Sequence, residues 1–238
     1  MKSDISGLTV EQTRVFNLDA VPFRFIFTPV VVNKIVEKYR SGISPEPSQK
    51  GIPSLQFNGG EFFLGKKIIP VNSFTIEERR VVLSIVGTSV EADHFFEDVK
   101  KTIIETLGSS ANFYDPIVKV DQSSCFVTLD AGIQKFFESS FISFCNKSLP
   151  SYNNLPEVQV ETHPFSLRIE LNFKVNNPEL LRSNITVGPK YLVIEKRLQT
   201  RPDENMYFVS SPFDTATHMK LIKDLESALK LKGSLPQK

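Results

Sequence analysis

The chain has 238 residues, of which 40% are hydrophobic and 23% are charged, and its formal net charge is +1. These values are typical of a globular protein that is long enough to bury a sizeable core. The balanced charge argues against a protein whose main task is to hold nucleic acid by an excess of positive side chains.

The first 53 residues predict helices, one short strand and an irregular segment. Thr9-Val-Glu-Gln12 fits a capping box, which predicts a short helix to about Phe16. Residues 22–27 place three phenylalanines on one face of a short strand. Thr28-Pro29 then opens a helix that ends near Gly42. The Pro- and Gly-rich residues 41–53 predict either a connector or a loop that closes a binding site.

Strand patterns follow from Ser54. Leu55 and Phe57 alternate, and Asn58-Gly59-Gly60 predicts a tight turn into a hairpin partner at residues 61–64. Residues 68–76 and 79–86 predict a second strand pair. The turn of that pair is expected near Glu77-Glu78.

The clearest helix begins at Thr88-Ser-Val-Glu91, a capping box, and ends at Gly108. Residues 117–120 and 125–129 read as two strands. Asp130 is then the expected N-cap of a helix that continues to about Leu149.

Phe165–Val175 is the most regular stretch of the chain, because apolar and polar residues alternate over all eleven positions. We expect a long strand around which the fold is organised, with residues 190–200 as its antiparallel partner. Leu192, Ile194 and Leu198 would face the core. A short strand at 206–209 and a helix capped by Asp214 end the chain. The apolar stripe of that helix is Ala216, Met219, Ile222, Leu225 and Leu229.

Strands run directly into capped helices near Thr88, Asp130 and Asp214. The predicted fold is therefore α+β, a two-layer sandwich of a mostly antiparallel sheet with three to four helices on one face. We expect a single domain over residues 1–238, with 109–112 as the candidate seam. The likeness of Ala92-Asp-His94 to Ala216-Thr-His218 could reflect an internal duplication, although amphipathic helices resemble one another by default.

Motifs for catalysis are missing. The sequence has no Gly-x-Gly-x-x-Gly, no Walker-type Gly-Lys-Ser/Thr, no Gly-x-Ser-x-Gly and no paired metal-ligand motif, so we expect no cofactor and no metal, and favour a non-enzyme. The alternative is an enzyme with a composite site near helix N-termini. That site would gather His94, His218 and either Asp93 or Glu91, closed by the loop at 41–53.

The segment from Phe165 to Arg201 holds seven basic and three acidic residues. If the residues named above face the core, Tyr191 and Val193 lie on the open side of the sheet, where a partner can bind. The predicted function is therefore that of a non-enzymatic protein-interaction or assembly protein, which self-associates or joins a complex. Nucleic-acid binding through this basic hairpin is the second alternative. The predicted partner-binding residues are Arg168, Lys174, Tyr191, Val193 and Arg197.

The two cysteines, Cys125 and Cys145, fall on apolar faces of a predicted strand and a predicted helix. We expect buried free thiols rather than a disulfide. No stretch approaches the ~20 apolar residues needed to cross a bilayer, and the N-terminus does not resemble a signal peptide. The predicted location is cytoplasmic.

Overall fold

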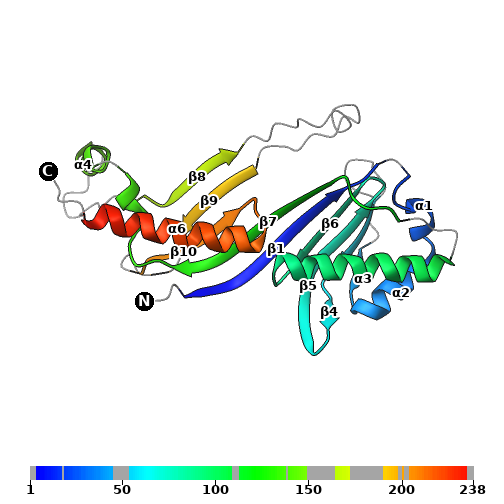
Figure 1. Cartoon of the computed structure of the whole chain (residues 1–238). Helices are drawn as coiled ribbons and strands as arrows, with labels where there is room; N and C mark the ends of the chain where they lie inside the picture. The colour runs from blue at the N-terminus through cyan, green and yellow to red at the C-terminus, as the bar shows by residue number, and fades with distance from the viewer. Residues whose placement is uncertain are drawn as a thin grey trace, which may run out of the picture.

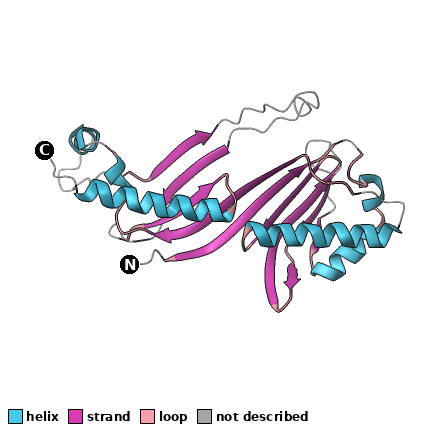
Figure 2. Cartoon of the chain, in the orientation of Figure 1, coloured by secondary structure: helices cyan, strands magenta, loops and turns pink. Residues whose placement is uncertain are grey.

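The structure is a computed structural model that describes residues 4–17, 19–44, 54–108, 113–137, 139–148, 164–171, 190–197, 200 and 204–234. It confirms the α+β class, since a large antiparallel sheet lies beside several helices (Figure 2). The strands are β1 Ile5–Val15, β2 Gly42–Ser44, β3 Ser54–Asn58, β4 Glu61–Leu64, β5 Lys67–Glu77, β6 Arg80–Ile85, β7 Val118–Thr128, β8 Ser166–Leu171, β9 Lys190–Lys196 and β10 Met206–Ser211. The helices are α1 Phe23–Ile26, α2 Pro29–Tyr39, α3 Ser89–Leu107, the 3₁₀ helix η2 Ile133–Phe136, α4 Ser139–Ser148 and α6 Thr215–Ser234.

The sheet is organised around β1 and β7. Its order is β2-β3-β5-β6-β1-β7-β10-β9-β8, and β4 pairs separately with β5. The expectation that Phe165–Val175 is the organising element is wrong, because its described part forms β8, the last strand in this order. Residues 172–175 lie outside the described residues. The predicted antiparallel pairing of β8 with β9 is confirmed.

Both long helices cover the same face of the sheet. Gln12 of β1 donates from Nε2 to Asp93 of α3 and to Asp121 of β7, both at 2.8 Å. Cys125, four residues further along β7, lies 3.4 Å from Nε2 of His218 in α6. Side chains separated by an even number of residues share one face of a strand, so α3 and α6 share what we call the covered face. Figure 1 shows these two helices end to end along the sheet.

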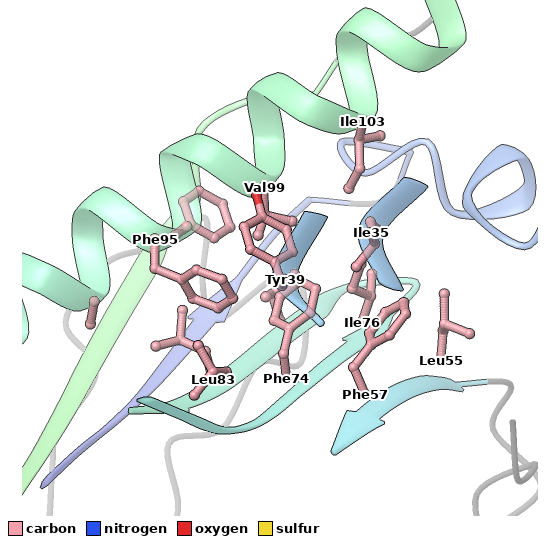
Figure 3. Packing of buried hydrophobic residues seen from close by; sticks show 14 of the residues in the cluster. Ile35, Tyr39, Leu55, Phe57, Phe74, Ile76, Leu83, Phe95, Val99 and Ile103 are labelled. Atoms are coloured by element: carbon pink, nitrogen blue, oxygen red, sulfur yellow. The ribbon is translucent and has the colours of Figure 1, made fainter. Parts of the chain in front are cut away.

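Two hydrophobic clusters fill the space beneath these helices. The first lies under α2 and α3, where Ile35, Tyr39 and Phe95 meet Phe57 and Phe74 of the sheet (Figure 3). The second lies under α6 and joins residues of β7, β9 and β10. Each helix therefore buries its apolar stripe on its own half of a continuous sheet.

The two halves repeat one order of elements. β1, two helical segments, further strands, β6 and α3 are matched by β7, η2, α4, further strands, β10 and α6. The helix N-termini meet at the middle, where the N–H of Ser89 donates to Thr215 Oγ1 at 2.8 Å and the N–H of Thr215 donates to Ser89 Oγ at 3.2 Å. Counted from these paired residues, Ala92 matches His218. The likeness of residues 92–94 to residues 216–218 therefore joins positions that are not equivalent.

The β1–β7 pairing, which has one register shift between Ser6 and Thr9, links the two halves. The candidate seam at 109–112 lies outside the described residues, so a single domain over 1–238 stays a prediction.

The helix predicted from Thr88 is confirmed in detail. Thr88 Oγ1 accepts from the N–H of Glu91 at 3.3 Å, and Glu91 Oε2 accepts from the N–H of Thr88 at 2.8 Å. The helix ends before Gly108, whose φ of +71° suits glycine. The helix predicted from Thr28-Pro29 is confirmed as α2.

Two expectations near the N-terminus are wrong. The predicted helix at 9–16 is part of β1, where Val10, Gln12 and Arg14 are buried with a period of two and pair with both neighbouring strands. The predicted strand at 22–27 is the short helix α1. Ile26 is its buried residue, and the rings of Phe23 and Phe27 meet at 4.6 Å, a contact between residues four apart.

The predicted hairpin of residues 54–64 is also wrong. β3 and β4 form, but each pairs with a different part of β5. Gly60 connects them where a Cβ atom would lie 2.8 Å from the carbonyl oxygen of Tyr39, so a side chain does not fit. The Asn58-Gly59-Gly60 turn therefore lies where the chain leaves one part of β5 and pairs with another part of the same strand.

Three expectations in the second half need correction. The strands predicted at 117–120 and 125–129 are one strand, β7, and the helix predicted over 130–149 is divided into η2 and α4. Ala216 is exposed rather than part of the α6 stripe, and the buried residue there is His218. Polar residues on inward positions, such as Ser123, obscured these patterns.

Candidate partner interface

The face opposite α3 and α6, which we call the uncovered face, carries a cluster of arginine and aromatic side chains on β7, β10, β9 and β8. Phe126 is the register partner of Phe208, and Val193 is the partner of both Ser210 and Arg168. Cys125, Val127, Val209 and Ile194 are buried on the covered face. Their neighbours in the chain therefore point to the uncovered face.

Close contacts form two groups within this cluster. The Phe126 and Phe208 rings lie 5.6 Å apart. The guanidinium carbon of Arg197 is 4.9 Å from the centroid of the Phe126 ring, and Arg197 Nη1 lies 3.3 Å from Met206 Sδ. The guanidinium carbon of Arg168 lies 3.9 Å from the centroid of the Tyr191 ring. A guanidinium over a ring face gains cation–π attraction and keeps N–H groups free to bind elsewhere.

Four of the five predicted partner-binding residues lie together. Arg168, Tyr191, Val193 and Arg197 all belong to this face, and both arginines are exposed. Lys174 lies outside the described residues. Their role in binding a partner stays a prediction.

Sequence reasoning missed the two phenylalanines. They belong to the strands predicted at 125–129 and 206–209, but neither was predicted as a site residue. The available signal was alternation, because each lies between two buried residues of its strand and must face away from the core. The Phe126 ring supplies the apolar surface on which Arg197 packs, and the Phe208 ring lies beside it.

The charges of this cluster are balanced. Arg168 and Arg197 lie on the uncovered face with Glu170 and Glu195, whereas Lys196 is the register partner of Tyr207 and falls on the covered face. Nucleic-acid binding relies on an excess of positive charge. The described residues of this face therefore show no such excess.

A Cys–His–Ser contact lies in the core under α6. His218 is fully buried, with Nδ1 2.7 Å from Ser211 Oγ and Nε2 3.4 Å from Cys125 Sγ. Burial lowers the pKa of His218 to about 4 and raises the pKa of Cys125 to about 11. Both groups are neutral near pH 7, so the thiol is not activated as a nucleophile. The prediction of a buried thiol is confirmed for Cys125; the side chain of Cys145 lies outside the described residues.

Three of the four residues of the composite-site alternative have other partners. His94 is exposed, whereas His218 is buried with both ring nitrogens in contact. Asp93 binds Arg14 at 2.6 Å, and Glu91 serves the helix cap and pairs with Lys67. Within the described ranges no group of three or more His, Cys, Asp or Glu side chains could hold a metal ion.

The loop at 41–53, expected as a connector or lid, contributes β2 at residues 42–44, and residues 45–53 lie outside the described part. No helix in the described part of the chain is long and apolar enough to span a bilayer. A scan of protein-family models finds no match to this chain. A search of curated proteins finds no significant match either.

Proposed function

We propose that this protein is a non-enzymatic binding protein that holds a protein partner on the uncovered face of β7, β10, β9 and β8. The observation that carries the proposal is the packing of two exposed arginines on aromatic rings there. Arginine and aromatic residues dominate the energetic centres of protein interfaces. Because the rings already hold the guanidinium groups in place, the two arginine side chains lose less conformational entropy when a partner binds them.

The partner is a protein surface that offers carboxylate groups to Arg168 and Arg197, either from a second copy of the chain or from another protein. An intracellular location belongs to the proposal, and the free buried thiol of Cys125 supports it, since such thiols suit a reducing compartment.

The experiment compares proteins purified from host cells under gentle conditions. The Arg168→Glu/Arg197→Glu variant should retain at least about tenfold less partner than the wild type, because interface arginines often contribute 2 kcal/mol or more. The matched control reverses the charge of two exposed helix residues, Lys34→Glu/Lys223→Glu, and should retain the wild-type amount. Equal retention by the two variants would refute the proposal. Both variants should keep the wild-type Tm, since all four residues are exposed.

A further inference from the structure

In the first half, helix α2 covers the part of the sheet that lies beside the long helix α3. Val31, Ile35 and Tyr39 are buried, and Figure 3 shows Ile35 and Tyr39 between α3 and the sheet. The Tyr39 hydroxyl donates to Asp98 Oδ2 at 2.7 Å, and Lys38 Nζ lies 2.8 Å from the same oxygen. The site beside α3 is therefore filled by a helix that has an apolar stripe and one lysine next to that stripe.

The second half has the corresponding place beside α6. Counted from the paired residues Ser89 and Thr215, α6 repeats the positions of α3 that receive α2. The matched residues are Phe95 with Leu221, Asp98 with Asp224, and Val99 with Leu225.

These α6 residues line a groove of about 500 Å³ together with Leu192 and Ile194 of β9. Its lining is mostly apolar, and its two charged residues, Lys220 and Asp224, are both exposed. The groove therefore repeats the apolar floor and the carboxylate that α2 meets in the first half.

Helix α4 follows η2 as α2 follows α1, but the described residues that line the groove include none of α4. Phe141 of α4 stacks instead on Phe137 at 6.0 Å, which holds α4 against the end of η2. Phe144 is 61% exposed. Among the described residues, the groove is lined by η2, β9 and α6, and no second long helix takes the place that α2 has in the first half.

We infer that this groove binds an amphipathic helix of a partner protein. The helix carries apolar side chains at i, i+4 and i+8, as α2 does with Val31, Ile35 and Tyr39. A lysine at i+7 pairs with Asp224, as Lys38 pairs with Asp98. This is a helix-in-groove contact on the covered side of the sheet, separate from the arginine–aromatic cluster.

The test uses a fluorescent peptide that copies residues 28–40, measured by fluorescence anisotropy against the full chain. A Kd of roughly tens to hundreds of micromolar is expected, because an isolated 13-residue helix must fold as it binds. Leu225→Asp should weaken binding at least about tenfold by placing a charge in the apolar groove. Ser227→Asp, two residues away on an exposed position, is the matched control and should bind like the wild type.

A charge swap tests the groove without altering its apolar floor. Asp224→Lys should weaken binding of the native peptide roughly threefold or more, and a peptide with aspartate in place of the lysine matching Lys38 should recover that loss. Asp224 is exposed, so this variant should fold normally even if Leu225→Asp does not.

Several results would overturn the inference. The first is no saturable binding up to about 1 mM peptide, and the second is binding that Leu225→Asp leaves unchanged. Binding that appears only in Phe141→Ser/Phe144→Ser would show that α4 of the same chain fills the groove. A wild-type dimer that Leu225→Asp converts to monomer would show that a second copy fills it.

Discussion

Replacing His218 by glutamine should remove the part of the acid sensitivity of this fold that comes from its buried imidazole. The imidazole is fully buried between Ser211 and Cys125, and burial lowers its pKa to about 4. In the unfolded chain a histidine has a pKa of about 6.5. The unfolded state therefore binds the proton more readily, and the stability that the neutral ring contributes is lost as the pH falls from about 6.5 towards 4. At pH 4.5 this difference amounts to roughly 2 to 3 kcal/mol.

The assay is urea unfolding at pH 7.5 and pH 4.5, followed by far-ultraviolet circular dichroism, for the wild type and His218→Gln. Hydrogen bonds to the carboxylate of Asp214 lower its pKa, so acid removes the stability that this carboxylate contributes in both proteins. Only the difference between the two proteins in their loss of unfolding free energy therefore reports on the histidine. The wild type should lose roughly 2 to 3 kcal/mol more than the variant. An equal loss, or an NMR titration of His218 near pH 6.5, would refute the view that the Cys125 contact is a buried structural one.

Three further substitutions test the framework. Thr88→Ala should lower the free energy of unfolding by about 1 kcal/mol through loss of the capping box, and Thr88→Ser should restore it, as thermal unfolding can show. Thr215→Val should cost roughly 1 to 3 kcal/mol, because the buried N–H of Ser89 loses its acceptor where the helices meet; a change below about 0.5 kcal/mol would contradict that role. Arg14→Met should lower the free energy of unfolding in urea by roughly 3 kcal/mol, since the Arg14 side chain is only 6% exposed and binds Asp93. Lys119 binds the same carboxylate but is more exposed, so Lys119→Met should cost less than about 1 kcal/mol. Equal losses for the two variants would contradict this account.

The fold class could be predicted from the sequence because most strands and long helices carry their own periodicity. The stripe of α3 and its capping box placed that helix to the residue. β1 could not be placed, because its inward side chains Gln12 and Arg14 are polar, and they are buried only through Asp93 and Asp121, which lie far away in sequence. When the inward residues of a strand are polar, the sequence lacks the alternation of apolar and polar residues that would predict the strand.

The centre of the sheet was misplaced for the same reason. β8 alternates more regularly than β7, yet β7 is central and carries Asp121 and Ser123 on its covered face. Regular alternation shows that a strand has two different faces, but not how many neighbours it has. That depends on pairing between distant residues, which local pattern does not encode.

The candidate interface could be predicted in part. Alternation placed Tyr191 and Val193 on the open side, and charge pointed to the two arginines. Phe126 and Phe208 were missed because a phenylalanine in an apolar run looks like core. Only the pairing of β7 with β10 shows that these rings meet on the uncovered face.

The most direct test of a partner on the uncovered face is photo-cross-linking in host cells, with p-benzoylphenylalanine in place of Val193. We expect one discrete adduct, which Arg168→Glu/Arg197→Glu abolishes, and none when the probe replaces the exposed Lys101 on α3. An adduct of twice 26.9 kDa would identify a second copy as the partner, and another mass a different protein. No adduct at Val193, or equal adducts at both positions, would contradict the proposed function.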